Sequence, residues 1–401
     1  MKDSKKGRYF TAVSLGTAAV WFSTHCGAGF ASGTQELQYF VNHGWFGPLM
    51  PLIAMAIVAF TFYVGIESAR QTDTWNYNGW SKQATEPIGR FCSVMMDVGI
   101  IITTVSATAA SLASGATLIA QTFHVPTMIG SIIMLACVTV ICIFGASLVR
   151  KNAMVMTVGI LVIIAIILVM GLAKFWPNIV ELFKEGYVNP EASKWSVTGS
   201  SNDVTQGTFG NAILWALTYA GFQVTAIGGV AASFKGAMSR KESKGAMIVG
   251  YVINVIMLCG ICFLIFSGMP EVYTDPEAKL LPTVWVVNHL DSTILAVIYP
   301  ILLFLALITT AVGFTFGMVE RLNPYVLKNM KNATLRNAII ALICLLVSYG
   351  VSTMGLMWVV QVAYKYLGIY NWIFVILPLW ILGLKNIRKR RLASMEQLDN
   401  K

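Results

Sequence analysis

A glycine-rich run lies in the middle of the first apolar segment of this 401-residue chain, at residues 27–33 (Gly-Ala-Gly-Phe-Ala-Ser-Gly). Lipid offers a backbone no hydrogen-bond partners, so an interrupted helix at membrane depth must be buried in protein or line a wet cavity. The Ala-Gly-Phe of residues 28–30 recurs at residues 220–222, with an offset of 192. Interruptions at corresponding places in two halves of a chain indicate a solute-binding site between the halves.

The composition is that of a polytopic membrane protein. Hydrophobic residues make up 56% of the chain and charged residues only 11%, against roughly 25% charged residues in a soluble domain. The polar connections are too short to fold alone. No zinc-protease HExxH motif and no serine or cysteine nucleophile beside a base is found, so an enzyme is not expected. Cys259 and Cys262 have CxxC spacing within an apolar segment, where packing is the expected role and a metal or redox site the alternative.

The pattern predicts an all-α fold with ten transmembrane helices. The expected spans are 9–40 (interrupted at 26–31), 47–69, 88–122, 126–148, 152–175, 207–234 (interrupted near 219–223), 244–268, 291–319, a ninth from about 335 and a tenth ending near 384. Five spans on each side of a long link make a 5+5 inverted repeat with broken helices 1 and 6. We expect a single domain over 1–401, with repeat one at 9–175, the link at 176–206, repeat two at 207–384 and a cytoplasmic tail at 385–401.

The basic residues predict the orientation. The net charge is +10, and 22 of the 28 Lys and Arg residues fall in the connections that share a side with both termini. Such an excess marks the cytoplasmic side, so both termini are expected inside, in the plasma membrane of a prokaryote. Residues 355–367 begin the tenth span or form a surface helix, and Lys365 is an interfacial lysine or an intramembrane charge. Residues 269–290 form a hairpin that caps a vestibule or a plain loop.

The interruption in the first span predicts two kinds of ligand. The helix before the break ends around Ser23 to Cys26, and its unpaired carbonyl groups suit a cation. The helix after it is expected to begin near Ser32, because Ser32 and Gln35 have the spacing of a capping box. The amides of residues 28–30 (Ala28, Gly29, Phe30) would then face the gap and receive a carboxylate.

Both interruptions have a packing alternative. Gly29 and Gly33 also form a GxxxG pair, which packs intact membrane helices, and the recurrence of the pattern favours a break. The second site adds the polar groups of Tyr219 and Gln223 beside Gly221, with Phe222 either closing over a ligand or packing in the core.

The eighth span carries Ala306, Thr309 and Thr310. Two adjacent hydroxyl groups and a carbonyl oxygen three or four residues earlier share one helix face, and such oxygen ligands suit a hard monovalent cation. The alternative is that each threonine bonds a carbonyl group of its own helix.

At these residues the chain resembles a known family. The run Gly-Ala-Gly-Phe-Ala-Ser-Gly-x-x-Glu at 27–36 is similar to that of the YkvI-type amino-acid permeases of the amino acid–polyamine–organocation superfamily. The ten-span inverted repeat with breaks in spans one and six resembles the leucine-transporter (LeuT) fold. The likeness covers essentially the whole chain, and the first-span motif is its most specific part.

The resemblance implies a set of site residues. Sodium ligands would be the carbonyl groups of Ser23, Cys26 and Ala306 with the hydroxyl groups of Thr309 and Thr310. Substrate would lie between the two breaks, against Ala28, Gly29, Phe30, Tyr219, Gly221, Phe222 and Gln223. Phe30 stands where some relatives place a second sodium ligand, so a second sodium site is not expected. Span five has no lysine after Lys151, unlike some proton-coupled relatives.

Other polar residues lie in the spans. Thr104, Thr108 and Ser111 share a face of span three, where they line the cavity or bond to neighbouring helices. Asp97, Glu67 and Glu320 lie toward the cytoplasmic side and predict inner-gate ion pairs with Arg70, Arg90 or Arg321. His25 adjoins the break, which keeps proton coupling open.

We therefore expect a secondary active transporter, a sodium-coupled symporter of a small amino acid or related small carboxylate that works by alternating access. The alternatives are a proton-coupled or uncoupled permease of the same fold and a non-transporting membrane sensor of such a ligand. Na+ is the expected coupling ion, without an organic cofactor. The expected partners are a small-molecule substrate and the lipid bilayer, with no nucleic acid, for a monomer or weak homo-oligomer.

Overall fold

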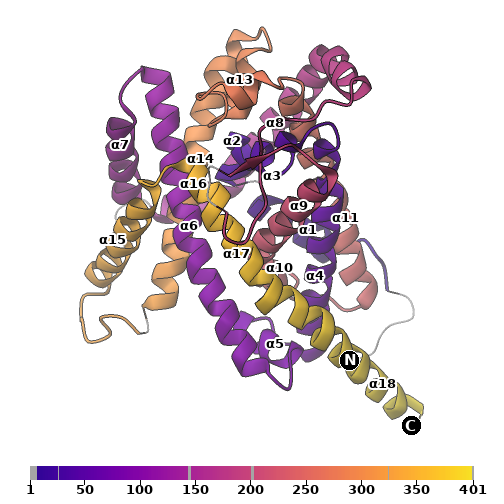
Figure 1. The fold of residues 1–401 in the computed structure, drawn as a ribbon. Coiled ribbons are helices and arrows are strands. Elements are labelled where there is room, and N and C mark those ends of the chain that lie inside the picture. Colours follow the sequence, from indigo (N-terminus) through magenta and orange to yellow (C-terminus); the bar gives the residue numbers. More distant parts are fainter. Residues whose placement is uncertain (1–6, 26, 143–145, 200–202, 324, 400–401) are drawn as a thin grey trace.

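The computed structural model describes residues 7–25, 27–142, 146–199, 203–323 and 325–399. Nearly all of this part of the chain is helical, apart from a short antiparallel pair, β1 (Ala192–Ser193) and β2 (Val204–Thr205), in which Ala192 pairs with Thr205. Most helices run between an upper end that carries α13 (Pro282–Asn288) and a lower end near both termini (Figure 1).

The first half contains α1 (Ala12–His25), α2 (Ala28–Ser32), α3 (Thr34–Tyr39), η1 (Val41–His43), η2 (Gly47–Leu49), α4 (Pro51–Thr72), α5 (Tyr77–Ala84), α6 (Gly89–Phe123), α7 (Thr127–Val140) and α8 (Ala146–Lys184). The predicted spans are present, but α8 continues to Lys184 instead of ending near 175. The predicted link is correspondingly shorter, because the polar residues after 175 extend the helix beyond the length needed to cross a bilayer.

The second half contains α9 (Phe209–Gln223), η4 (Val224–Ala226), α10 (Ile227–Ser233), α11 (Arg240–Phe266), α12 (Glu271–Thr274), α13, α14 (Thr293–Leu322) and α15 (Ala333–Ser352). The last helix begins at Leu356 and passes through α16 (Leu356–Trp358), η5 (Val359–Ala363), α17 (Tyr364–Asn371), η6 (Trp372–Ile376), η7 (Leu379–Gly383) and α18 (Leu384–Asp399). Of the two predictions for residues 355–367, the start of the tenth span is confirmed.

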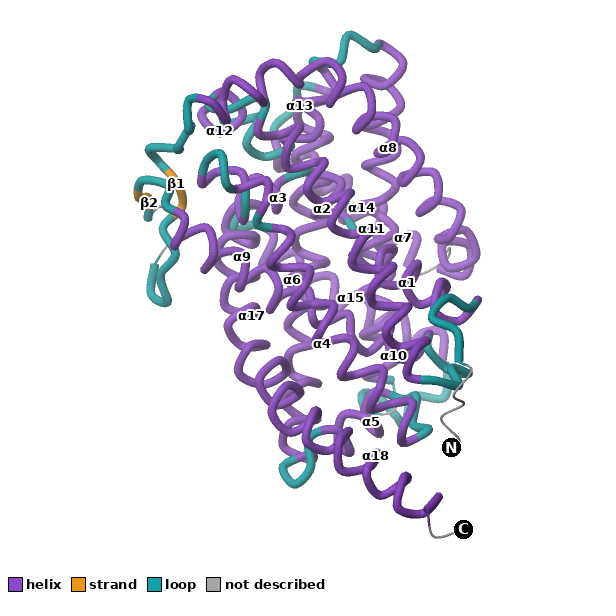
Figure 2. The backbone as a smooth tube through the Cα atoms, turned by 90° about the vertical axis from the view of Figure 1, so that its right-hand side faces the viewer, coloured by secondary structure: helices purple, strands orange, loops and turns teal. Residues whose placement is uncertain are grey.

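Eight helices in the described part of the chain are long and apolar enough to cross a membrane. The other two predicted spans correspond to the interrupted series α1–α3 and to α7, a shorter apolar helix. The series α1–α3 runs upward from the end that bears the termini, whereas α9 and α10 run downward (Figures 1 and 2). The two halves therefore cross the molecule in opposite directions, as an inverted repeat requires.

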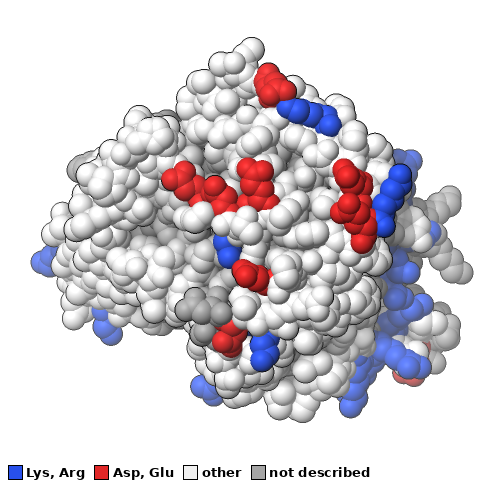
Figure 3. Space-filling model, turned by 45° about the horizontal axis from the view of Figure 1, so that its top comes forward, with Lys and Arg blue, Asp and Glu red and all other residues white. Residues whose placement is uncertain are grey.

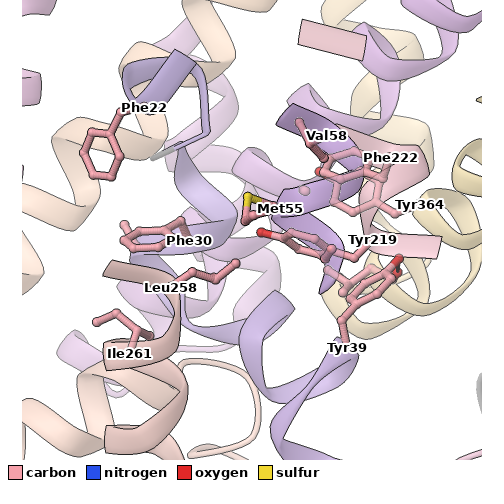
Figure 4. Packing of buried hydrophobic residues seen from close by; sticks show 14 of the residues in the cluster. Phe22, Phe30, Tyr39, Met55, Val58, Tyr219, Phe222, Leu258, Ile261 and Tyr364 are labelled. Carbon is pink, nitrogen blue, oxygen red and sulfur yellow. Dashed lines mark hydrogen bonds between the residues drawn. The ribbon is translucent and has the colours of Figure 1, made fainter. Parts of the chain in front are cut away.

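The helices pack in two groups. In one, α1 packs against α11 and α10, and α4 packs against α11 and α9. In the other, α6 packs against α14, α7 and α15. A continuous core of buried aromatic and aliphatic residues joins the groups; Figure 4 shows part of it, with Phe30, Tyr39, Tyr219 and Phe222. The interrupted helices α1–α2 and α9–α10 thus lie where the two groups meet.

Candidate functional site

The first span is interrupted twice. Helix α1 ends at His25, and α2 begins at Ala28 after Gly27, which has an extended backbone. Cys26 lies outside the described residues. A second bend follows at Gly33, whose φ of +80° lies in the left-handed region that glycine adopts without strain. The predicted break at 26–31 is confirmed at its first residues, and the GxxxG alternative of an intact packed helix is wrong.

The predicted capping box at Ser32 is wrong. Helix α3 begins after Gly33 without a side-chain cap, and the Ser32 hydroxyl group donates to the carbonyl oxygen of Gly29 (2.9 Å) inside α2. The amide end of Gln35 instead lies against Gly29, where an added Cβ would overlap it. The tight turn at Gly33 therefore directs Gln35 back toward the break.

The second interruption differs from the prediction in place and in kind. Residues 219–223 continue α9 without a break, and the helix tightens into the 3₁₀ turn η4 one residue later. The Ile227 amide donates to the Val224 carbonyl oxygen, so the peptide groups stay paired through the turn. The prediction of free peptide groups at 219–223 is wrong, because a 3₁₀ turn bends a helix without opening it.

A cavity of about 450 Å³ lies between these interruptions. This volume is within the range of small-molecule sites. Its walls come from α1, α2, α3, α6, α9–α10 and α14, with one residue of α17. The lining residues are Ser23, Thr24, His25, Gly27, Gly29, Phe30, Gln35, Ile100, Thr103, Thr104, Ala107, Ser111, Phe222, Gln223, Thr225, Ala226, Gly229, Thr309, Thr310, Gly313, Phe314 and Tyr364.

Four residues of the cavity wall are exposed. The exposed residues of its wall, Ser23, Thr24, Gly229 and Gly313, lie on α1, α10 and α14 toward the end that bears the termini. Toward the opposite end, every residue of α3 is buried. The exposed part of the wall is thus the part nearer the termini, whereas the part toward α13 is buried.

Five of the predicted substrate residues line this cavity: Gly29, Phe30, Thr104, Phe222 and Gln223. The others lie elsewhere. Ala28 begins α2, and the structure does not describe its side chain. Thr108 is buried outside the wall. Tyr219 is buried and bonds His25, as described below.

Gly221 packs helices together instead of lining the cavity. A Cβ at Gly221 would overlap the Gly368 carbonyl oxygen of α17, and the Asn371 side-chain amide donates to the Gly221 carbonyl oxygen (2.9 Å). Close backbone approach at small residues is typical of packed membrane helices. Gly221 therefore lies against α17, outside the cavity wall, in this arrangement of helices.

The hydroxyl groups of span three bond their own helix. Thr104 donates to the Ile100 carbonyl oxygen (2.9 Å), and Ser111 donates to that of Ala107 (2.9 Å). Both residues line the cavity, so the predicted bonding between neighbouring helices is wrong for them. Their hydroxyl oxygens keep lone pairs that can accept further hydrogen bonds.

His25 joins three elements at the break. One ring nitrogen is 2.5 Å from Asn254 Oδ1 on α11, and the other is 2.8 Å from the Tyr219 hydroxyl group on α9. The imidazole is buried against the edge of the Phe30 ring. His25 therefore fixes the end of α1 to both neighbouring helices.

The predicted sodium ligands are brought together in part. Ser23, Thr309 and Thr310 line the cavity, and Thr310 faces Gly27 across the break. The Thr309 hydroxyl group donates to the Ala306 carbonyl oxygen (3.0 Å), the self-bonding alternative for this helix. The Ala306 side chain borders a separate small apolar space with Tyr299.

Sequence reasoning missed several wall residues, including Gln35, Thr225, Gly313, Phe314 and Tyr364. Tyr364 stacks on Phe222 with ring centroids 4.1 Å apart and planes at 21° (Figure 4). Tyr364 lies in residues 355–367, for which the sequence left two structures open, and nothing in the sequence placed it at the cavity. It lies beside Phe222 because α17 packs against α9.

The segment 269–290 forms a lid over the start of α3. It folds as α12 and α13 rather than as a hairpin or a plain loop. The Thr34 hydroxyl group donates to the Leu280 carbonyl oxygen (2.6 Å), and a Cβ at Gly33 would overlap Thr283. The expectation that this segment caps a vestibule agrees with these contacts.

Two buried or half-buried ion pairs lie toward the termini. Arg70 pairs with Glu67 through both carboxylate oxygens (2.9 and 2.7 Å) within α4, and Arg321 of α14 pairs with Asp97 of α6. The first pair lies within one packing group and the second joins two helices of the other. Lys365 is buried and donates to the Gly199 carbonyl oxygen (2.8 Å), which ties the last helix to the link.

No cluster of three or more His, Cys, Asp or Glu side chains that suits a metal ion occurs among the described residues. Cys259 and Cys262 carry free thiol groups, and Cys262 is part of the apolar core. This agrees with the packing role expected for the pair.

No known family and no curated protein matches the sequence. Solved structures do match. An outward-open Na+-coupled sialic acid symporter has a TM-score of 0.56 at 13% identity, over 94% of this chain and 79% of the other. Inward-facing Mhp1 has a TM-score of 0.55 at 12% identity, over 91% and 75%. A manganese transporter mutant from Eremococcus coleocola has a TM-score of 0.52 at 13% identity, over 98% and 87%.

These structures are transporters, and at such identities the likeness concerns the fold. The described helices, the two opposed halves and the interruptions in spans one and six agree with it. The chain therefore has the all-α, inverted-repeat fold with interrupted helices that is shared by transporters of the LeuT type.

Proposed function

We propose that this protein is a secondary active transporter that couples the entry of Na+ to the uptake of a small amino acid or related small carboxylate by alternating access. The observation that carries the proposal is the meeting of Ser23, Thr309 and Thr310 at the wall of one cavity, with Thr310 facing Gly27 at the break. Hydroxyl and carbonyl oxygens are ligands that suit a hard monovalent cation. The Na+-coupled symporter among the similar structures supports the same reading.

The cavity wall favours a neutral or simple anionic substrate. Among the described wall residues none is Asp, Glu, Lys or Arg, so the site suits a neutral or simple anionic solute better than a dibasic one. The amide groups that begin α2 have no carbonyl partner within that helix and suit a carboxylate. Phe30, Phe222 and Tyr364 supply apolar surface around it.

The arrangement of the cavity supports alternating access. With the termini in the cytoplasm of a prokaryotic cell, the exposed part of the wall is the inner one and the lid lies on the outer face. We propose that the group containing α1, α4, α9–α10 and α11 rocks against the group built on α6 and α14 within one domain. Sodium and substrate must favour the same arrangement, so each should raise the affinity for the other.

Uptake into proteoliposomes tests the proposal. A set of amino acids and small organic acids is offered under a sodium gradient or a pH gradient. We expect uptake of at least one solute under the sodium gradient, and a loss of about tenfold in sodium stimulation when Thr309→Ala is combined with Thr310→Ala. Thr315→Ala is the matched control, because Thr315 bonds its own helix on α14 outside the cavity.

The other possible outcomes contradict the sodium site or point to one of the alternative functions. Unchanged sodium stimulation in the double variant contradicts the sodium site. Uptake driven by the pH gradient alone identifies a proton-coupled permease. Binding of a solute without flux identifies a sensor.

A further inference from the structure

Glu36 is a buried carboxyl group outside the cavity. It lies on α3, has no exposed surface, and neither of its carboxyl oxygens has a hydrogen-bond partner among the described residues. The neighbouring Gln35 lines the cavity, whereas Glu36 does not. Binding of the proposed substrate or sodium ion in the cavity therefore does not explain why a carboxyl group is buried at this position.

No cationic side chain of the surrounding elements compensates Glu36. The elements packed most closely against α3 are α2, η1, η5, α9, α11 and α13. Their ionisable side chains near α3 are Cys262 on α11, which interacts electrostatically with Glu36, Tyr219 on α9, bonded to His25, and His43 on η1, close to Asn211. Tyr39, on α3 itself, bonds the Val360 carbonyl oxygen.

The remaining charges of α11 are distant. Its Lys, Arg and Glu residues lie between Arg240 and Lys244, about 27 Å along the helix from Cys262 at 1.5 Å per residue. An isolated carboxylate in such surroundings is so unfavourable that the group takes up a proton instead. In this closed arrangement Glu36 is therefore the neutral acid.

The lid (residues 269–290) is held against the start of α3, the helix that carries Glu36. Helix α3 begins at the positive-φ turn of Gly33 and is held to the lid through Thr34 and Leu280. Thr283 of α13 fills the space beside Gly33. Movement of the lid away from α3 would expose the start of that helix to water, and a hydrated carboxyl group ionises at neutral pH.

We propose that Glu36 is a proton-binding site and that the lid closes over α3 only when this site is occupied. On closing, a carboxylate oxygen of Glu36 forms an O–H bond while an O–H bond of a hydronium ion breaks and water leaves. Lid opening reverses the exchange. The lid movement rests on the proposed function, because it is the outer half of alternating access. The cycle then depends on the proton concentration at the lid face, whichever ion drives the substrate.

Hydrogen–deuterium exchange of the purified full chain in lipid nanodiscs tests this inference without substrate or sodium. Exchange of the amides in 282–288 is followed from pH 5 to pH 9, with exposure times rescaled for the intrinsic rate at each pH. One proton bound on closing predicts that the open fraction of the wild-type lid rises about tenfold per pH unit. Glu36→Gln is neutral at every pH, so its lid should stay closed with no slope, and Glu36→Asp should restore the slope.

The controls separate the effect of Glu36 from that of the ionisable residues of the lid. Glu271, Asp275, Glu277 and His289 remain in the Glu36→Gln variant, so any slope that they cause persists there. Exchange in α15, far from the lid in the chain, reports whether each variant is folded. Equal slopes in the wild type and Glu36→Gln, or no slope in the wild type, overturn the proton site. Failure to find a transported solute leaves this result unaffected, so the two proposals fail separately.

Discussion

Gly33 sets the direction of α3 and leaves space for the lid. Its φ of +80° places the backbone where a Cβ carries a steric cost, and Thr283 occupies the space that a side chain would need. The residue therefore has two independent reasons to be glycine. Ser32, which the sequence motif favoured as the cap of the following helix, bonds back into α2 instead.

Gly33→Ala should loosen the lid. The left-handed conformation costs a residue with a Cβ about 1–2 kcal/mol, and the overlap with Thr283 adds to it. We expect faster amide exchange in 282–288 at a fixed pH. Gly186→Ala is the matched control, since Gly186 has a φ of +62° and open space around it, and it should cost the strain alone. Equal exchange of the lid in both variants would show that the contact with Thr283 is unimportant.

At the scale of helices, the seam between α9 and α17 explains why Gly221, within the predicted second break, does not line the cavity. Gly221 and Gly368 let the two backbones approach each other closely, and the Trp372 indole donates to the Leu217 carbonyl oxygen (2.6 Å). This contact also carries Tyr364 to the cavity beside Phe222. The seam thus positions one wall of the site.

Gly368→Ala should separate this seam. Its Cβ would overlap the Thr218 carbonyl oxygen, a backbone atom that cannot move independently of α9. Overpacking of this kind costs about 1–3 kcal/mol, so the thermal midpoint in detergent should fall. Gly350→Ala, in α15 with open space around it, should be neutral or stabilising, because alanine favours a helix. An unchanged thermal midpoint in Gly368→Ala would mean that α9 and α17 can move apart without loss of stability.

At the scale of the whole molecule, charge separates the two ends. In Figure 3 most of the visible Asp and Glu lie over the forward face, with some Lys and Arg beside them, while further Lys and Arg lie along the right-hand and lower edges. Helix α18 alone carries Lys385, Arg388, Lys389, Arg390 and Arg391. An excess of basic residues on the side of the termini is the usual sign of the cytoplasmic side.

Cysteine labelling in intact cells tests this orientation. Val197→Cys on the link and Met395→Cys on α18 both replace exposed side chains. A membrane-impermeant maleimide should label the first in intact cells and the second only after permeabilisation, with the unsubstituted protein as the background control. The reverse pattern would place the termini outside and make the lid face cytoplasmic.

The sequence alone determined the class of fold and most helices, because the length and apolarity of a membrane span are local properties that the bilayer imposes. It also located the first break, where glycines and unpaired peptide groups occur together within a few residues. The resemblance to the LeuT fold, rather than spacing along single helices, placed the residues of that break and Thr309–Thr310 at one site.

Only the tertiary structure decided which side chains face the cavity. Tyr219 turns to His25, Gly221 packs against α17, and Gln35 and Tyr364 enter the wall from helices that periodicity could not orient. A helix surrounded by lipid and protein is apolar on all sides, so its sequence does not mark the inward face. That face, and the burial of Glu36 on α3, depend on contacts between segments far apart in the chain.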